Sequence, residues 1–257
     1  MAVRIRNRFD LSGKVAIVTG SSKGIGEAMA RGMAEFGAKV IISSRSQEAV
    51  DAVAEQYRQD DLEATGIACH VADAGDRAQL MEQTLATYGR LDILINNAAT
   101  NPYFGPVEGL TPAAYQKTLD VNLTAALELS NLALPHLREA GGGSVIHISS
   151  VEGLHANPNF AAYNISKAGI IMLGKSQAAE WARDNIRVNV ICPGLVKTKL
   201  SRALWEDERM EEQMKKSIPL RRMATPDEVA GVAVYLASDA ASYVTGSVVT
   251  VDGGMIG

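Results

Sequence analysis

The stretch that decides the fold is Thr19-Gly20-Ser21-Ser22-Lys23-Gly24-Ile25-Gly26. It follows the β-branched and apolar run Lys14–Thr19 and precedes the helical pattern Ile25–Phe36. A strand, a glycine-rich turn and a helix in this order form the unit in which backbone N–H groups and a helix N-terminus face a pyrophosphate. The glycine spacing is Gly-x-x-x-Gly-x-Gly, so the strand-turn-helix context carries the prediction of dinucleotide binding. The alternative is a glycine turn that serves packing alone.

Short apolar runs alternate with longer segments of helical period along the chain. The runs are apolar throughout, as expected for strands buried on both faces of a parallel sheet. The expected strands are Lys14–Thr19, Lys39–Ser44, Thr65–His70, Leu91–Asn96, Ser144–Ser149, Arg187–Cys192 and Ser247–Val251. The expected helices are Ile25–Phe36, Gln47–Gln59, Arg77–Tyr88, Thr111–Leu137, Ala161–Arg183 and Pro226–Ser238. This order predicts an α/β fold, a Rossmann-type doubly wound parallel sheet of about seven strands with helices on both faces.

The composition is that of a globular domain, with 47% hydrophobic and 21% charged residues among 257. This balance excludes a disordered chain. No linker, repeat or change of composition divides the sequence, so we expect residues 1–257 to form a single domain. The net charge of −4 provides no basic field for a phosphate backbone, which argues against nucleic acid as the main partner.

The sequence gives no sign of a membrane or secreted protein. No apolar run reaches the roughly 18 residues that a membrane helix needs, and no apolar stretch follows Met1–Phe9 as it does in a secretory signal. We therefore expect a cytoplasmic protein without a membrane partner. Two cysteines, Cys69 and Cys192, are too few for a disulfide framework, and the 4 histidines lack the spacing of metal ligands, so no metal is expected.

The end of the second expected strand indicates which dinucleotide binds. An acidic residue there would bind the ribose hydroxyls of NAD, whereas a cation accommodates the additional phosphate of NADP. This strand ends in Ser43-Ser44-Arg45, without a carboxylate. A guanidinium with hydroxyl donors suits a phosphate, so Arg45, Ser44 and Lys23 favour NADP(H), with NAD(H) left possible. The alternative is that both cations are ordinary solvated side chains.

Tyr163-Asn164-Ile165-Ser166-Lys167 places a phenol and an ammonium four residues apart near the start of an expected helix, and so on one face. A phenol with its ordinary pKa near 10 is a poor base at neutral pH. A nearby cation lowers that pKa, which suits the phenol to give a proton to a carbonyl oxygen or to take one from an alcohol. The pair predicts acid–base chemistry, although exposed helices also carry such pairs by chance.

Together with the glycine turn, these residues make the sequence from about Leu11 to Gly254 resemble the classical short-chain dehydrogenase/reductase family. Further matching motifs are Asn96-Asn97-Ala98-Ala99, Asn122, Ser149-Ser150, Pro193-Gly194 and Thr198. The interval of 13 residues from Ser150 to Tyr163 is the family's spacing and selects Ser150 over Ser149. A closer similarity is to the branch of NADP-dependent carbonyl and retinal reductases, in Cys69-His70-Val71, the segment 97–105 and the segment 201–205.

The resemblance implies a catalytic set of four residues. Tyr163 would be the general acid in reduction, and Ser150 would orient the substrate oxygen. Lys167 would bind the nicotinamide ribose and lower the pKa of Tyr163, while Asn122 would hold a water that relays protons. The cofactor would supply the hydride, and the protein would supply placement and a proton donor.

The glycine turn, the end of the second expected strand and the family resemblance together imply which residues contact the cofactor. The family often has an acid for the adenine amino group where His70 stands, so the adenine contact is expected to differ. The full set of expected cofactor residues is Gly20, Ser22, Lys23, Gly24, Ile25, Gly26, Ser44, Arg45, His70, Val71, Asn97, Ala98, Tyr163, Lys167, Pro193, Gly194, Val196 and Thr198.

The segment at about 199–217 breaks the alternation, and the family places a mobile substrate lid there. The alternative is a plain surface helix. The expected substrate contacts, in part aromatic and without a cationic cluster, are Asn101, Tyr103, His155, Phe160, Leu204 and Trp205. His155 has the alternative of being merely solvated. A moderately apolar ketone, aldehyde or diketone fits this set better than a strongly anionic substrate.

These observations predict an NADP(H)-dependent carbonyl reductase or alcohol dehydrogenase. A sugar-acid or 3-oxoacyl/hydroxyacyl dehydrogenase of the same family, or a scaffold that binds NADP without chemistry, are the alternatives. The helices Thr111–Leu137 and Ala161–Arg183 carry more apolar residues than one sheet face needs, and the family is commonly tetrameric, so a homotetramer is expected. The alternative is that these apolar residues all belong to the core of one chain.

Overall fold

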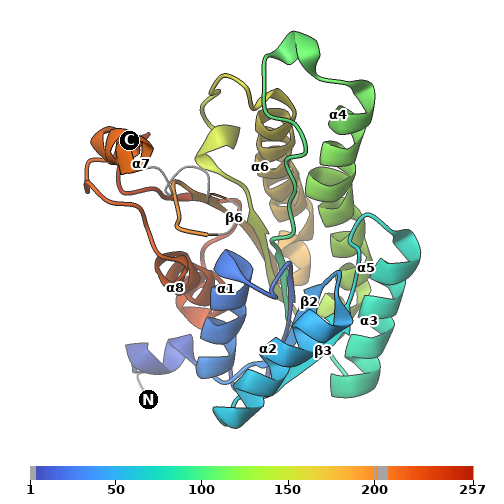
Figure 1. The fold of residues 1–257 in the computed structure, drawn as a ribbon. Helices are drawn as coiled ribbons and strands as arrows, with labels where there is room; N and C mark the ends of the chain where they lie inside the picture. Colours follow the sequence, from blue (N-terminus) through green and yellow to red (C-terminus); the bar gives the residue numbers. More distant parts are fainter. Residues whose placement is uncertain (1–3, 199–200, 202–207, 257) are drawn as a thin grey trace.

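A parallel sheet of seven strands forms the centre of the molecule (Figure 1), shown by a computed structural model that describes residues 4–198, 201 and 208–256. The strand order is β3-β2-β1-β4-β5-β6-β7. The strands are β1 Val15–Thr19, β2 Lys39–Ser44, β3 Ala64–Ala68, β4 Ile93–Asn96, β5 Gly143–Ile148, β6 Ile186–Pro193 and β7 Val248–Val251. Every neighbouring pair is parallel, so the doubly wound α/β fold predicted from the sequence is confirmed.

Helices cover both faces of the sheet (Figure 1). The first face carries α1 Gly24–Glu35, α2 Gln47–Gln59 and α8 Pro226–Ala237, which share one buried apolar cluster. The second face carries α3 Ala74–Tyr88, α5 Ala125–Glu139 and α6 Ala161–Trp181, which share another. Strands buried on both sides explain why their sequences are apolar throughout and do not alternate.

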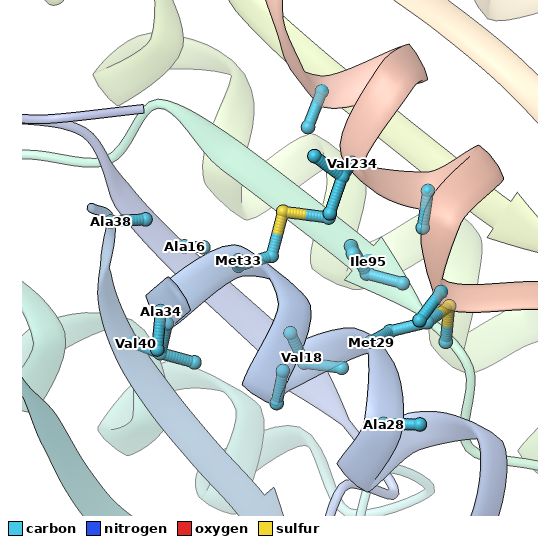
Figure 2. Packing of buried hydrophobic residues seen from close by; sticks show 14 of the residues in the cluster. Ala16, Val18, Ala28, Met29, Met33, Ala34, Ala38, Val40, Ile95 and Val234 are labelled. Atoms are coloured by element: carbon cyan, nitrogen blue, oxygen red, sulfur yellow. The ribbon is translucent and has the colours of Figure 1, made fainter. Parts of the chain in front are cut away.

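The core on the first face depends on two methionines of α1 (Figure 2). Met29 and Met33 are both 0% exposed and pack in the same cluster as Val18 of β1 and Val234 of α8. Each fully buried side chain of this size contributes about 1.5–3 kcal/mol to stability relative to an exposed one. This packing fixes α1, and therefore its N-terminus, against the carboxyl end of β1.

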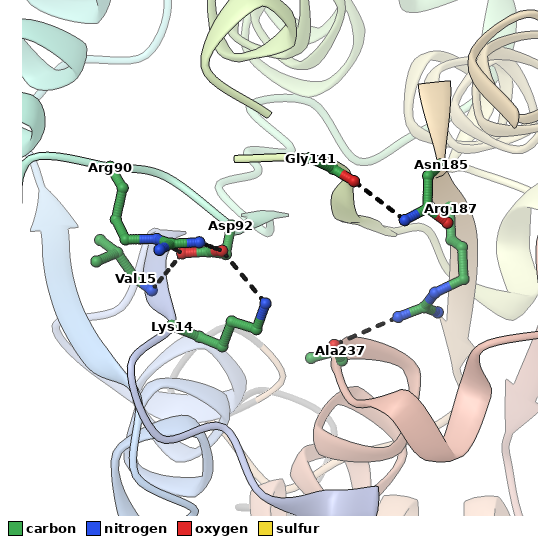
Figure 3. Close-up of polar contacts among 8 residues, drawn as sticks. All are labelled: Lys14, Val15, Arg90, Asp92, Gly141, Asn185, Arg187 and Ala237. Carbon is green, nitrogen blue, oxygen red and sulfur yellow. Dashed lines mark hydrogen bonds and ion pairs between the residues drawn. The ribbon is translucent and has the colours of Figure 1, made fainter. Parts of the chain in front are cut away.

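Charged side chains occupy the opposite end of the strands (Figure 3). Asp92, which precedes β4 and is 1% exposed, accepts hydrogen bonds from Arg90 at 2.6 and 2.8 Å and from the backbone of Val15 at 3.0 Å. Arg187 of β6 donates to the carbonyl oxygens of Leu236 at 2.7 Å and of Ala237 at 3.3 Å, at the C-terminal end of α8. These contacts join chain segments at the end of the sheet remote from the glycine turn, and so they serve stability.

The expected helix 111–137 consists of three pieces. An α-helix, α4 Pro112–Leu119, passes through a π-helical turn, η3 Asp120–Thr124, into α5. A π turn holds one more residue than an α turn and is frequent at functional sites. After β6, helix α7 spans Glu208–Ser217, while the expected lid residues Leu204 and Trp205 lie outside the described residues. Among the described residues, none of the helices combines the length and the hydropathy that crossing a bilayer requires.

Candidate active site

The expected site residues gather at the carboxyl ends of β1, β4, β5 and β6. Strand order reverses between β1 and β4, and open α/β sheets bind their ligands at such a switch point. A small cavity lies there, and its walls come from these strands, α5 and η3: Thr19, Val71, Asn96, Ala98, Val121, Asn122, Ala125, Ala126, Leu129 and Ile148. Three of the expected site residues, Val71, Ala98 and Asn122, therefore meet around one space.

The glycine turn has the conformation of a close-approach cradle. Gly20 and Gly24 have φ of 66° and 64°, in the left-handed region that favours glycine. A Cβ on Gly26 would lie 2.3 Å from the carbonyl oxygen of Gly20 and 2.4 Å from Asn97 Nδ2. The first turn of α1 thus presses on the loop without room for a side chain, and its N-terminal N–H groups face the space over the turn.

Asn97 holds the glycine turn to the end of β4. Its side-chain Nδ2 donates to the carbonyl oxygens of Thr19 at 2.8 Å and Gly20 at 3.2 Å. In return, Thr19 Oγ1 accepts the backbone N–H of Asn97 at 3.0 Å and of Ala98 at 3.1 Å. Asn97, expected to line the cofactor channel, therefore also sets the position of the turn.

The groups expected to select the cofactor stand at the rim. Arg45 and Lys23 are exposed, Ser44 and Ser22 are half-buried, and Lys23 is the N-cap of α1. Ser21 fastens this region, because its hydroxyl donates to the carbonyl oxygen of Val18 at 2.6 Å and accepts the N–H of Ser43 at 2.9 Å. Ser21 thus ties the end of β1 to the end of β2, with Lys23 in the turn after β1 and Arg45 directly after β2.

The loop after β6 closes the other side of the glycine turn. A Cβ on Gly24 would lie 3.5 Å from Thr198 Cγ2, so Thr198 stands directly over the turn. Pro193 ends β6, Gly194 donates its N–H to Val251 at 3.0 Å, and Val196 is 4% exposed in the core. Burial of Val196 indicates that its side chain packs in the core, so any cofactor contact from it comes from the backbone.

The end of β3 presents backbone groups held by acidic and basic side chains. His70 is exposed and its N–H donates to Asp76 Oδ2 at 2.8 Å. The buried Arg77 donates to the carbonyl oxygen of Val71 at 2.5 Å and pairs with Glu128 of α5. Val71 therefore has a fixed position at the cavity, while the His70 imidazole faces solvent.

The side chain of Ser150 acts on the phenol of Tyr163, because it lowers the pKa of that group. Ser149 Oγ donates elsewhere, to the carbonyl oxygen of Lys167 at 2.7 Å. Burial raises the pKa of Tyr163 to about 12, although Ser150 opposes the shift. The phenol therefore keeps its proton at neutral pH and is equipped to donate it.

The pKa of Tyr163 is raised overall, so the expected lowering by Lys167 stays a prediction. Lys167 Nζ lies 5.5 Å from the centre of the Tyr163 ring and donates to the carbonyl oxygen of Ile148 at 2.8 Å. Lys167 is 3% exposed, and burial lowers its own pKa to about 8. Burial is the largest cause of the shift in each of these two pKa values.

Asn122 joins three elements from the π turn. Its Oδ1 accepts the N–H of Thr100 at 2.8 Å, and its Nδ2 donates to the carbonyl oxygen of Thr100 and to Ser166 Oγ, both at 3.0 Å. The side chain is 3% exposed. It therefore fixes the loop after β4 against α6, on the same helix as Tyr163 and Lys167.

The expected substrate residues behave differently from one another. Phe160 lies beside Tyr163, with ring centres 6.3 Å apart, and the exposed Phe104 packs on Phe160 at 4.9 Å. The Tyr103 hydroxyl instead donates to Pro106 at 2.7 Å, within its own loop. His155 is exposed, and the buried Asn101 Oδ1 has no hydrogen-bond partner among the described residues.

Three site residues escaped the sequence analysis. Glu152 follows Ser150 by two positions, and its Oε1 accepts from Asn157 Nδ2 at 2.7 Å. Asn164, next to Tyr163, donates to the carbonyl oxygen of Asn157 at 3.0 Å. The signal in the sequence was the acidic residue Glu152 between Ser150 and Tyr163. Spacing alone does not reveal which side chains Glu152 contacts.

Comparisons with known proteins agree with this geometry. A family model described as enoyl-(acyl carrier protein) reductase matches residues 20–256. The human dehydrogenase/reductase SDR family member 4 is 43% identical over 247 residues, which cover 96% of this chain and 89% of that protein.

Two solved structures are also similar. A gluconate 5-dehydrogenase from Burkholderia cenocepacia in complex with NADP and tartrate has a TM-score of 0.94 and 34% identity, over 98% of each chain. A 7α-hydroxysteroid dehydrogenase complexed with NADH and 7-oxo glycochenodeoxycholic acid has a TM-score of 0.94 and 31% identity, over 99% of this chain and 98% of that one.

Proposed function

The chain belongs to the short-chain dehydrogenase/reductase family, an oxidoreductase family, and on that premise we propose that it is an NADP(H)-dependent carbonyl reductase or alcohol dehydrogenase. The pairing of the Ser150 and Tyr163 side chains at the carboxyl edge of the sheet carries the proposal. This pair offers a carbonyl oxygen two donors in one place. The 43% identity to the human dehydrogenase/reductase SDR family member 4 also supports an oxidoreductase function.

The residues at the carboxyl edge fit a dinucleotide phosphate. Gly20 and Gly24 take the left-handed conformation of the turn, Gly26 packs against the turn without room for a Cβ, and the N-terminus of α1 supplies N–H groups for the pyrophosphate. Arg45 and Lys23 are exposed beside this cradle, where they would bind the 2′-phosphate. The gluconate 5-dehydrogenase that resembles this chain was solved with NADP, which supports the preference.

The chain's own groups place and protonate the substrate. Tyr163 gives its proton to the substrate oxygen in reduction and takes it back in oxidation, and Ser150 orients that oxygen. Lys167 holds the ribose side of the cofactor, and Asn122 keeps the loop after β4 and α6 in register around it. When bound, NADPH would supply the hydride for the carbonyl carbon and would itself become NADP⁺.

The proposed substrate is a ketone, aldehyde or diketone of moderate polarity. Phe160 and Phe104 provide an aromatic wall next to Tyr163, and the described residues around the phenol present no exposed cationic cluster. A sugar-acid dehydrogenase is the second candidate, because the similar gluconate 5-dehydrogenase was solved with tartrate.

A panel of ketones, aldehydes, sugar acids and acyl thioesters, assayed with NADPH or NADP⁺ and with NADH or NAD⁺, tests the proposal. We expect turnover of neutral carbonyls with NADPH. A clear preference for sugar acids would establish the second candidate instead, and NADPH binding with no turnover of any carbonyl would indicate a scaffold without chemistry.

We also propose a homotetramer. Large apolar side chains remain exposed on α5, Leu127 and Leu132, and on α6, Ile165 and Met172, which is 61% exposed. Exposed apolar side chains gathered on neighbouring helices favour burial against a second copy. Light scattering after size-exclusion chromatography measures the mass directly, and a monomer would refute this assembly.

A further inference from the structure

Glu152 has its backbone fixed beside the reacting groups. It lies in the short turn η4 (Val151–Gly153), and its N–H donates to Ser150 Oγ at 3.1 Å. A Cβ on Gly153 would lie 2.7 Å from the carbonyl oxygen of Lys167, so the turn presses directly on α6. The backbone therefore fixes where the Glu152 side chain leaves the chain relative to Ser150 and Lys167.

Two asparagines orient the Glu152 side chain. Its Oε1 accepts from Asn157 Nδ2 at 2.7 Å, and the carbonyl oxygen of Asn157 accepts from Asn164 Nδ2 at 3.0 Å. Asn164 is the neighbour of Tyr163 on α6. One oxygen of the carboxylate is thus used to hold the loop 154–160, and the other is left for a different partner.

That second oxygen is buried and has no hydrogen-bond partner among the described residues. The same holds for Asn164 Oδ1, which belongs to the same chain of contacts. Buried acceptors are almost always paired in folded proteins, and leaving one unpaired destabilises the fold. Two unpaired acceptors beside one reacting phenol call for a ligand that donates hydrogen bonds.

The charge of Glu152 reaches the reacting phenol. Its carboxylate is one of the causes that raise the pKa of Tyr163. Lys167, the buried cation of the site, directs its ammonium to the carbonyl oxygen of Ile148. The field around the substrate oxygen is therefore negative on this side, which favours a donor or a cation there and opposes an anion.

We propose that Glu152, with Asn164 beside it, is a specificity-determining residue that binds a hydroxyl or ammonium group on the carbon next to the reacting carbon. The same carboxylate repels substrates that carry a carboxylate at that place. The inference rests on the proposed oxidoreductase function and narrows its substrates to carbonyl compounds and alcohols with a neighbouring hydrogen-bond donor.

Four alcohols with a shared CH₃–CHOH unit test the proposal: 1,2-propanediol, 1-amino-2-propanol, 2-butanol and lactate. In each, oxidation moves a hydride to NADP⁺ and a proton to the deprotonated phenolate form of Tyr163, and gives the ketone, so all assays are run at one alkaline pH. For the wild type we expect kcat/KM for the diol and the amino alcohol to exceed that for 2-butanol by about tenfold, with lactate poorest.

Two variants separate hydrogen bonding from charge. Glu152→Gln keeps one acceptor oxygen, for Asn157, and presents an NH2 donor to the substrate in place of the second oxygen. A hydroxyl can accept from this NH2, so the diol should stay within about threefold, while the ammonium of the amino alcohol cannot accept and should lose about tenfold; lactate should improve. Glu152→Ala should lose the preference for the diol as well. Glu139→Gln, at an exposed residue of α5, is the matched control. It should leave the relative kcat/KM values of the four alcohols unchanged.

Unchanged ratios in Glu152→Gln, or equal kcat/KM for the diol and 2-butanol in the wild type, would overturn the proposal. If the wild type oxidises none of the four and reduces no carbonyl, the proposed function itself has failed. Calorimetric binding to the NADP⁺-saturated protein then decides: tight binding of the amino alcohol that Glu152→Gln abolishes supports the site, and equal binding of amino alcohol and lactate refutes it.

Discussion

The ammonium of Lys167 lies 5.5 Å from the centre of the Tyr163 ring but gives its hydrogen bond to the carbonyl oxygen of Ile148, at 2.8 Å. Desolvation raises the pKa of the half-buried Tyr163 to about 12 and lowers that of the buried Lys167 to about 8. The free protein thus holds a protonated phenol beside a cation that begins to lose its proton just above neutral pH. This arrangement suits the proposed reduction of a carbonyl.

Removal of the Tyr163 hydroxyl should abolish proton transfer without disturbing cofactor binding. A positioned general acid contributes about 10²–10⁴-fold to the rate, so Tyr163→Phe should lower kcat for ketone reduction by that factor. The Kd for NADPH, measured by fluorescence, should change less than threefold. Tyr243→Phe, at a fully exposed tyrosine, is the control. Full activity in Tyr163→Phe would exclude the proposed mechanism.

Cofactor capture should weaken as pH rises through about 8. Lys167 has a pKa lowered to about 8, so it is charged below this pH and neutral above it. The kcat/KM for NADPH reports the free enzyme, and we expect it to fall in this window. Lys167→Arg should move the decline to higher pH, because guanidinium stays charged.

The exposed Lys175 on the same helix provides the control, since Lys175→Arg should leave the pH profile unchanged. If Lys167→Arg is inactive, NADPH binding to Lys167→Met should be weak but should no longer depend on pH near 8. A decline that persists at pH 8 in both variants would assign it to another group.

Cofactor preference should depend on the end of β2. A carboxylate in Ser44→Asp would repel the 2′-phosphate, so KM for NADPH should rise about tenfold or more while KM for NADH changes far less. Arg45→Ala should act in the same direction because it removes a charge-assisted bond. Arg183→Ala, at an exposed residue after α6, should affect neither. Equal effects on both cofactors would contradict the assignment to NADP.

His147 should make the fold sensitive to acid. It is 0% exposed, its Nε2 and Gln177 Oε1 lie 2.7 Å apart, and burial lowers its pKa from 6.5 to about 4. Between these values the unfolded chain binds more protons than the folded one, so stability falls as pH falls from 6.5 towards 4. This residue alone should cost about 2 kcal/mol between pH 7 and pH 5.

Urea unfolding at the two pH values measures this term. The loss of stability from pH 7 to pH 5 should be smaller in His147→Gln than in the wild type, whatever its absolute stability. His136→Gln, at the half-buried histidine of α5, should leave the loss unchanged. Identical pH dependence in wild type and His147→Gln would show that another group is responsible.

Asp92 should stabilise the fold without contributing to catalysis. It lies at the far end of the strands and binds Arg90, Lys14 and the backbone of Val15 (Figure 3). Because Arg90 and Lys14 are nearly half exposed, Asp92→Asn should lower the free energy of unfolding by only about 2 kcal/mol. The kcat should stay unchanged, and Asp61→Asn at an exposed turn is the control. A fall in kcat would show that Asp92 contributes to catalysis.

The fold follows closely from the sequence because buried parallel strands leave a direct pattern. The run Lys39–Ser44 matches β2 to the residue, and the glycine turn marks the start of α1. The apolar run 91–96 begins before β4, because Asp92 there points to charged partners at the sheet's end. Hydrophobic pattern therefore locates elements well and their first residues less well.

The candidate site follows from the sequence only in part. Spacing selected Ser150, and not its neighbour Ser149, as the serine that acts with Tyr163. It did not predict the pKa of Tyr163, since that value depends on how deeply tertiary packing buries the phenol. Nor did it predict the unpaired oxygen of Glu152, because that oxygen depends on the directions taken by Asn157 and Asn164.

The π turn at Asp120–Thr124 makes the site depend on a count of residues as well as on their identity. A π turn is an α-helix with one residue inserted, so deleting any residue of the turn would allow α4 and α5 to merge into one unbroken α-helix. The helix would then rotate by about 100° on one side of the deletion. Asn122 would turn away from Thr100 and Ser166, although no site residue had been substituted. The number of residues in this helix is therefore as strictly constrained as their identity. Deleting one residue of the turn should inactivate the protein, whereas substitutions at exposed positions of the helix should not.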